Sequence, residues 1–245
     1  MQEEIFKTRY HEMNPKGQIP VWVLQNYFQE AAGIDAHNLS YGWEELSING
    51  VAWILTKLQM QILKPIVGGS QKIKVKTWHC YSDKIQSRRD FIMFNEAGEH
   101  IAKGVSWWLI MDLNKRKITR SPQSLIDLND KNPAPIMEPS MEKPPRETEL
   151  GVLLNTVKLT ARLEDLDSNN HVNNSHFSAW ALESLSAERT EGKTLAEIII
   201  HFKAEVRHGD EVLAKLYTAG QDCYWHILKR PLDDKEIAAV YTKWE

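Results

Sequence analysis

Hydrophobic positions follow two spacings along the chain, and blocks of one spacing alternate with blocks of the other. Near residues 20 and 177, apolar and small side chains recur at helical spacing and share one face. They are Leu24, Tyr27, Phe28 and Ala31 in the first block, and Phe177, Trp180, Ala181, Ser184 and Leu185 in the second. We therefore predict two amphipathic helices, with Pro20 suited to the first turn of the earlier one.

Only strand-like segments follow each predicted helix, and glycine-containing turns such as Gly68-Gly69 and Gly209-Asp210 separate them. The predicted strands are 53–63, 72–78, 89–95 and 101–112 in the first block, and 196–206, 212–219, 224–230 and 236–243 in the second. One helix followed by several antiparallel strands, given twice, predicts an α+β fold in which a curved sheet wraps a helix.

A proline-rich stretch at 121–149 separates the two blocks and is predicted to be a linker. It divides the chain into an N-terminal domain, 1–120, and a C-terminal domain, 150–245. The helices repeat at an offset of ~153 residues and the strands at ~139, so the first copy carries an insertion of ~14, which we place at 41–49. The two domains are thus predicted to be copies of one fold.

Composition narrows the class of protein. The chain has 245 residues, 42% hydrophobic and 26% charged, which is ordinary for a globular protein. A net charge of -3 argues against nucleic acid as a partner. Two cysteines, Cys80 and Cys223, are too few for a disulfide framework or a zinc site. No signal peptide and no apolar run long enough to cross a membrane is visible, so we expect a cytoplasmic protein without metal or cofactor.

The segment 163–174 carries the most chemistry, because it gathers Asp, Asn and His side chains directly before the second predicted helix. Such residues favour turns and helix N-caps, and Asn173 or Asn174 is a candidate cap. Unpaired N–H groups at the helix start would be available to a ligand carbonyl. On composition alone, a simple cap and turn explains the segment.

The internal repeat gives the segment a second interpretation. With the helices in register, Asp167, Asn169 and His171 lie opposite Asn14, Lys16 and Gln18. Only the second copy therefore has a carboxylate and an imidazole, as expected if one copy performs chemistry. Glu205, near the end of the predicted strand 196–206, adds another carboxylate opposite Ile66.

The run Asp167-x-Asn169-x-His171-Val172-Asn173-Asn174, followed by Trp180-x-x-Glu183-Ser184, resembles the plant and bacterial acyl-acyl-carrier-protein thioesterases. The resemblance extends over nearly the whole chain. Further matching segments are Trp53-x-x-Thr56-Lys57-Leu58-Gln59, Arg88-Arg89-Asp90, 106–112, Glu205 and Asp210. Plant members often carry a cysteine after that glutamate, whereas this chain has Val206, so a cysteine nucleophile is not required here.

The resemblance implies two tandem hot-dog domains and hydrolysis of fatty acyl thioesters on acyl carrier protein, which releases free fatty acid and ends chain elongation. It implies the candidate catalytic set Asp167, Asn169, His171 and Glu205. Thioester hydrolysis needs an oxyanion site and a base for water, while the thiol leaving group, with a pKa near ~8.5, needs little acid assistance. The base is Glu205 or Asp167, directly or through His171, and an acyl-enzyme route stays open.

Residues expected to bind substrate lie in both domains. Asn173 and Asn174 are candidates beside the chemistry, while Trp53 and Leu58 are candidates for an acyl-chain pocket in a first domain that lacks a catalytic base. Acidic carrier protein would need positive surface, for which the candidates are Arg88-Arg89 and Lys115-Arg116-Lys117 with Arg120. Glu183 is expected to form a polar pair in the core or in an interface.

Other functions fit the same pattern. One is a thioesterase acting on coenzyme A thioesters, and others are a dehydratase or an acyl-binding module with the same fold. A homodimer is possible but not required, because two tandem copies can pair within one chain.

Overall fold

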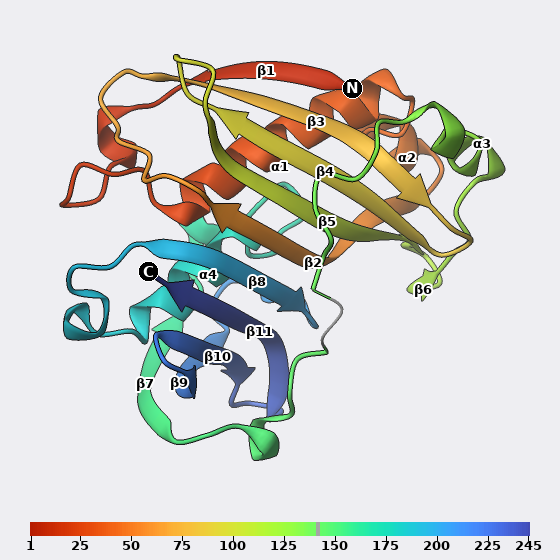
Figure 1. Cartoon of the computed structure of the whole chain (residues 1–245). Helices are drawn as coiled ribbons and strands as arrows, with labels where there is room; N and C mark the ends of the chain where they lie inside the picture. The colour runs from red at the N-terminus through yellow and green to blue at the C-terminus, as the bar shows by residue number, and fades with distance from the viewer. Residues whose placement is uncertain (141–142) are drawn as a thin grey trace. The chain divides into compact units, whose positions relative to one another are not determined.

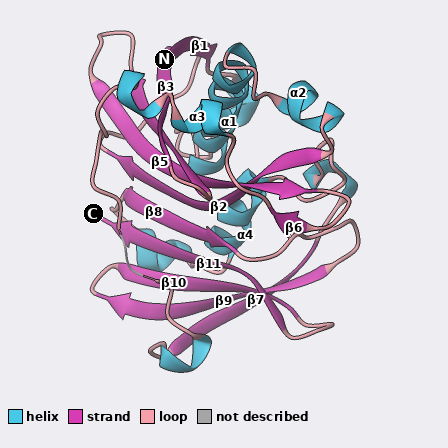
Figure 2. Cartoon of the chain, turned by 90° about the vertical axis from the view of Figure 1, so that its right-hand side faces the viewer, coloured by secondary structure: helices cyan, strands magenta, loops and turns pink. Residues whose placement is uncertain are grey.

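Two units, Met1–Pro139 and Ser140–Glu245, make up the chain in the computed structural model, which describes residues 1–140 and 143–245. Each unit contains one main helix and an antiparallel sheet, shown in Figures 1 and 2. The α+β class expected from the sequence is confirmed.

The first unit has the strand order β1-β3-β4-β5-β2, with the short β6 paired to β5. The strands are β1 (Gln2–Lys7), β2 (Val51–Ile62), β3 (Lys72–Ser82), β4 (Gln86–Phe94), β5 (His100–Asp112) and β6 (Lys117–Ile118). The helices are α1 (Val21–Asn38), α2 (Trp43–Ile48) and α3 (Gln123–Ile126).

Helix α1 packs on β1 and β3 through the face predicted from its spacing, and Leu24, Tyr27, Phe28 and Ala31 are all buried. Phe28 stacks on Phe91 of β4, with ring centroids 4.2 Å apart. Gly104 of β5 allows this approach, since a Cβ at this position would lie 2.6 Å from the Phe28 ring. The absence of a side chain at one strand position thus seats the helix on its sheet.

The second unit has the strand order β8-β11-β10-β9-β7. Its elements are β7 (Leu153–Thr160), α4 (Asn174–Glu183), β8 (Leu195–Phe202), β9 (Glu211–Gly220), β10 (Cys223–Arg230) and β11 (Lys235–Trp244). Helix α4 packs on β9, β10 and β11, and Phe177, Trp180, Ala181 and Ser184 are buried as predicted. Leu185 falls just beyond the helix and is half-buried.

The internal repeat is confirmed by matching backbone hydrogen bonds. The N–H of Thr8 donates to the carbonyl of Gln71, and that of Ala161 donates to Asp210, both at 2.9 Å. The N–H of Ile19 donates to the carbonyl of Ile66, and the N–H of Val172 donates to the carbonyl of Val206, both at 2.8 Å. Ile66 and Val206 are therefore equivalent positions in the two copies. Glu205 then corresponds to Pro65, one residue before Ile66, which the sequence alignment had placed opposite it.

Three details of the sequence-based description need correction. A strand, β1 or β7, precedes the helix in each unit and was not expected. Strand β8 ends at Phe202, so Glu205 lies beyond the strand and not within it. The insertion expected at 41–49 is present there as α2 (Trp43–Ile48), but α1 is also longer than its counterpart, with 18 residues against 10 in α4.

The predicted linker, 121–149, contains ordered structure, although residues 141–142 of it lie outside the described residues. On the first unit, Ile136 donates its N–H to Asp90 at 2.8 Å, and Arg88 donates to the Met137 carbonyl at 2.6 Å. On the second, the Glu147 carboxylate accepts bonds from Lys215 and Tyr217, both at 2.6 Å. Each end of this segment is therefore fastened to the sheet of its own unit.

Candidate active site

The loop before α4 is a tight turn built around the Asp167 carboxylate. Asp167 Oδ1 accepts the N–H of Asn169 at 2.8 Å and that of His171 at 3.3 Å. The Asp167 N–H donates to the His171 carbonyl at 2.7 Å, and Asn170 adopts φ +60° at the tip. The turn holds the backbone of Asn169 and His171 in place, while the Asn169 side chain is exposed to solvent.

His171 meets Glu205 next to this turn. His171 Nε2 lies 3.3 Å from Glu205 Oε2, and both side chains are partly exposed, at 28% and 37%. The guanidinium of Arg207 approaches Glu205 Oε1 at 3.2 Å. Arg230 donates to the Glu205 carbonyl at 3.3 Å, and the Val172–Val206 bond joins the two segments. An imidazole and a carboxylate 34 residues apart in sequence are thus brought together at a solvent-accessible place.

Asn173 is the N-cap of α4, as the sequence suggested for Asn173 or Asn174. Its side-chain oxygen accepts both the N–H and the hydroxyl of Ser175 at 3.0 Å. The backbone carbonyl of Asn173 accepts the N–H of His176 at 3.0 Å. Within residues 1–140 and 143–245, no backbone acceptor is recorded for the N–H of Asn174, the first residue of α4, as expected for an N–H group in the first turn of a helix.

Asp165 and His176 belong to the same loop and were missed by sequence reasoning. The buried Asp165 carboxylate accepts the Arg162 N–H at 2.8 Å and lies 3.5 Å from His176 Nδ1. The Asp165 carbonyl accepts the N–H of Asn173 at 2.9 Å, which ties the loop to the helix start. Burial lowers the pKa of His176, against the opposing effect of Asp165. The Arg-x-x-acid spacing, present also as Arg9 and Glu12, was the signal that could have identified this anchor.

The first copy contains the same turn with different chemistry. Asn14 Oδ1 accepts the N–H groups of Lys16 and Gln18 at 2.9 and 3.0 Å, and the Asn14 N–H donates to the Gln18 carbonyl at 2.8 Å. Gly17 has φ +72° where the second copy has Asn170. An amide therefore shapes this turn as well as a carboxylate does, so the turn itself does not require the charge of Asp167.

The proposed acyl-pocket residues of the first unit already have packing partners. Trp53 donates its indole N–H to the Tyr41 carbonyl at 2.9 Å and packs edge-on against Trp108, with ring centroids 6.5 Å apart. Leu58 is buried in β2. These contacts give both residues a structural role.

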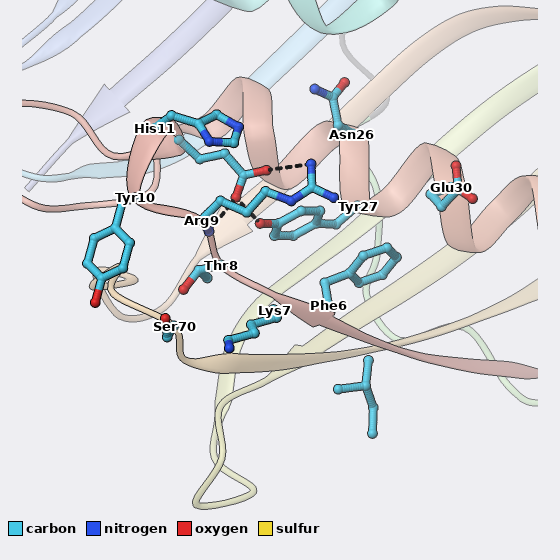
Figure 3. A pocket seen from close by; sticks show the side chains of 12 residues that line it. Phe6, Lys7, Thr8, Arg9, Tyr10, His11, Asn26, Tyr27, Glu30 and Ser70 are labelled. Atoms are coloured by element: carbon cyan, nitrogen blue, oxygen red, sulfur yellow. Dashed lines mark hydrogen bonds and ion pairs between the residues drawn. The ribbon is translucent and has the colours of Figure 1, made fainter.

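A depression lies in the first unit between β1, the 3₁₀ turn Tyr10–Glu12 and α1, and Figure 3 shows the side chains that line it. Its volume is about 930 Å³. On one wall, the Tyr27 hydroxyl and the Arg9 N–H both donate to Glu12, at 2.7 and 2.8 Å. Neither Trp53 nor Leu58 lines this depression. It is an open, charged surface feature and does not provide an apolar pocket for an acyl chain.

The structure corrects two other expectations from the sequence, one of them in part. Arg88 and Arg89 are buried, and they pair with Asp90 at 2.6 Å and with Asp35 at 2.7 Å, so they offer no docking surface. Glu183 is exposed at the end of α4, which excludes the polar pair in the core, while a pair in an interface stays a prediction. Across the described part of the chain, no cluster of three or more His, Cys, Asp or Glu side chains is placed to hold a metal ion, and no helix is long and apolar enough to cross a membrane.

Comparison with known proteins identifies relatives that match along nearly the whole chain. Acyl-acyl-carrier-protein hydrolase FATB2 of Cuphea viscosissima, a chloroplastic protein, is 27% identical over 98% of this chain and 61% of its own length. Oleoyl-acyl carrier protein thioesterase 2 of Arabidopsis thaliana, also chloroplastic, is 24% identical over 99% of this chain and 76% of its own length. The chain thus spans less than two thirds of the Cuphea relative.

Solved structures show the same fold and confirm the tandem hot-dog arrangement expected from the sequence. An acyl-ACP thioesterase from Bacteroides thetaiotaomicron superposes with a TM-score of 0.87 at 22% identity, covering 99% of this chain and 97% of that one. The 12:0-ACP thioesterase from Umbellularia californica gives 0.85 at 18% identity, covering 99% and 96%. The model of the acyl-ACP thioesterase N-terminal domain matches residues 1–128, and that of the C-terminal domain matches residues 154–245. The chain therefore belongs to the acyl-ACP thioesterase family.

Proposed function

We propose that this protein hydrolyses fatty acyl thioesters of acyl carrier protein, releasing free fatty acid and thereby ending chain elongation. The observation that carries the proposal is the pairing of His171 with Glu205 beside the Asp167 turn. Family membership and the names of the relatives support the reaction. The reaction consumes water: a C–O bond forms at the acyl carbon, the C–S bond breaks, and the carrier leaves as a thiol.

In the proposed mechanism, the His171–Glu205 pair receives the proton of the attacking water. The carboxylate of Glu205 stabilises the imidazolium that forms, since opposite charges lie within ion-pair distance. The proton then passes to the departing sulfur, for which a thiol pKa near ~8.5 demands no strong acid. The guanidinium of Arg207 is a second neighbour of Glu205, on the other carboxylate oxygen.

The oxyanion site in this proposal lies at the start of α4. The N–H of Asn174, in the first turn of α4, and the exposed side-chain amide of Asn169 are the donors offered to the developing negative charge. Asn173 would act by holding this end of the helix, since its own amide oxygen is occupied by Ser175. Asp167 would contribute its negative charge near the reacting groups, and an acyl-enzyme route through this carboxylate remains an alternative to direct attack by water.

A thiol-release assay tests the proposal. Acyl carrier proteins loaded with chains of graded length should each release thiol, whereas 3-hydroxyacyl thioesters should not be dehydrated. The variants Asn169→Ala, His171→Ala and Glu205→Gln should lose activity while keeping the wild-type fold. If no acyl chain on any carrier yields thiol, the assignment as a hydrolase is wrong, and a folded variant with the wild-type rate removes its residue from the mechanism.

The carrier is tested separately by comparing kcat/KM for one acyl chain on acyl carrier protein and on coenzyme A. We expect the protein carrier to be preferred. The acyl-chain role of Trp53 and Leu58, the cytoplasmic location and a homodimer stay predictions, and the relatives described above are chloroplastic.

A further inference from the structure

A positively charged surface forms at one end of the first unit, where the β3–β4 turn lies beside the segment that follows β5. We call the surface made by Lys84, Ile85, Leu113, Lys117, Ile118 and Arg120 the basic end surface. Ser121 donates its N–H to the Lys84 carbonyl at 2.9 Å, which brings the two segments side by side. The residue before it, Arg120, therefore lies close to the β3–β4 turn.

The positive charge of this surface comes from three side chains. Lys84, Lys117 and Arg120 are exposed, and none of the three has an ion-pair partner among the described residues. Lys117 pairs in register with Asp112 of β5, and from Lys117 the chain reaches Arg120 in three residues, about 10 Å at the rise of an extended chain. Three positive charges thus lie within roughly one to two Debye lengths of each other at physiological salt.

The two carboxylates in these turns, Asp83 and Asp112, accept hydrogen bonds from backbone N–H groups. Asp83 Oδ1 accepts the N–H groups of Ile85 and Gln86, both at 2.7 Å. Asp112 accepts the N–H groups of Asn114 and Lys115, at 3.0 and 2.8 Å, and Lys115 also pairs with it. Backbone and side-chain hydrogen bonds from Lys115 lower the pKa of Asp112, so it remains a bound turn-forming anion. Both turns thereby present cations outward.

Exposed apolar side chains lie among these cations. Ile85 is 44% exposed, Leu113 is 49% exposed and Ile118 is 42% exposed. A surface that combines apolar side chains with unpaired cations is suited to a protein partner with an acidic, amphipathic face. In a chain whose net charge is -3, this local excess of positive charge runs against the sign of the whole molecule.

We propose that the basic end surface is the docking site for the acidic carrier protein that bears the acyl chain. The inference rests on the proposed function, and it replaces Arg88 and Arg89, which are buried, with Lys84 and the segment around Lys117. Electrostatic attraction would raise the rate of encounter, and the isoleucines would provide the apolar contact that orients the carrier.

The test compares two thioesters with the same acyl chain, one on acyl carrier protein and one on the small carrier N-acetylcysteamine. The triple variant Lys84→Glu/Lys117→Glu/Arg120→Glu should raise KM for the carrier-protein substrate about 30-fold at low salt and leave the small thioester within about twofold. High salt should weaken wild-type turnover of the carrier-protein substrate in the same direction. None of the three residues belongs to the proposed catalytic machinery.

Lys72→Glu is the matched control, because Lys72 is exposed at the opposite end of β3, about 30 Å along the strand from the β3–β4 turn. It should leave both substrates unchanged. Equal effects of the triple variant and Lys72→Glu, an unchanged KM for the carrier substrate, or equal losses on both substrates would each overturn the docking site. Binding of the wild type to anionic vesicles with no affinity for carrier protein would also overturn it.

Direct binding separates this inference from the proposed reaction. Fluorescence anisotropy of labelled acyl carrier protein should report binding by the wild type and a loss of affinity in the triple variant. If neither thioester is hydrolysed but this difference in binding persists, the reaction fails and the docking site stands. If both are hydrolysed and binding does not differ, the docking site fails and the reaction stands.

Discussion

Replacing Asp167 by asparagine separates the shape of the active loop from its charge. The first copy already carries asparagine at the equivalent position, where Asn14 Oδ1 accepts two N–H groups at 2.9 and 3.0 Å. In Asp167→Asn the amide oxygen can accept the same two bonds that the carboxylate accepts, at 2.8 and 3.3 Å. We expect the free energy of unfolding to change by less than about 1 kcal/mol, since neither donor loses its acceptor.

The catalytic rate, unlike the stability, should change strongly in Asp167→Asn. If the negative charge of Asp167 acts on the reacting groups, Asp167→Asn should lower kcat about 10²- to 10⁴-fold. Asp167→Ala removes both accepted hydrogen bonds and should lower the free energy of unfolding by about 1–3 kcal/mol in addition. Only the comparison of the two variants distinguishes lost chemistry from a collapsed turn.

The assay is thiol release from acyl carrier protein under single-turnover conditions, with urea unfolding of each variant measured in parallel. Two outcomes would refute the reasoning. Near-wild-type turnover by Asp167→Asn would show that the carboxylate only shapes the turn. A loss of stability equal to that of Asp167→Ala would show that an amide cannot shape this turn and that the two copies are not equivalent.

Three further predictions follow from other contacts. Glu205→Gln should abolish thiol release, because the imidazole of His171 loses its anionic partner, while circular dichroism should show that the fold is retained. Asp35→Ala leaves Arg89 buried without its partner and should reduce the free energy of unfolding, measured in urea, by about 3–5 kcal/mol; a loss below about 1 kcal/mol contradicts this. Burial lowers the pKa of His226 to about 4, so between pH 6.5 and 4 the unfolded chain binds the extra proton and stability falls as pH falls. Replacing His226 with glutamine should flatten that part of the pH–stability curve.

The stabilising effect of the hydrogen bonds that the Glu147 carboxylate accepts from Lys215 and Tyr217 should also depend on pH. Partial burial would raise the pKa of this carboxyl, but hydrogen bonds from Lys215, Tyr217 and Lys229 outweigh that effect and lower it to about 2. Because the folded pKa lies below the ordinary value of 4.5, the anchor stabilises the fold fully above pH 4.5 and is lost as pH falls towards 2. Amide exchange of residues 147–149 at pH 6 and pH 3 measures this loss, and Glu147→Gln should remove the difference between the two pH values.

The sequence predicted the elements whose signal is periodic and long. Helix faces such as that of Leu24 and Phe28 were correct, because burial on one side imposes a regular spacing. Strand β1 was missed because it alternates exposed and half-buried positions and its sequence is rich in charged residues. An edge strand of this kind has no run of apolar residues to reveal it.

The site was only partly predictable for a different reason. The repeat identified Asp167, Asn169 and His171 as the unusual copy, since that comparison needs no distances. The burial of Arg89 was not predictable, because its partner, Asp35, lies 54 residues earlier and only the folded chain joins them. Asp165 was overlooked because Arg162 and Glu164 beside it are also charged, so the sequence of the whole stretch resembled a solvated turn.

The twin turns around Asn14 and Asp167 have a consequence for how such a protein can change over evolutionary time. A turn that an amide and a carboxylate shape equally well imposes no folding penalty on a substitution between them. One copy can therefore lose or gain activity by substitution without an intermediate variant that fails to fold. Two copies that share a backbone but not a charge are free to diverge, and selection on the reaction needs to act on only one of them.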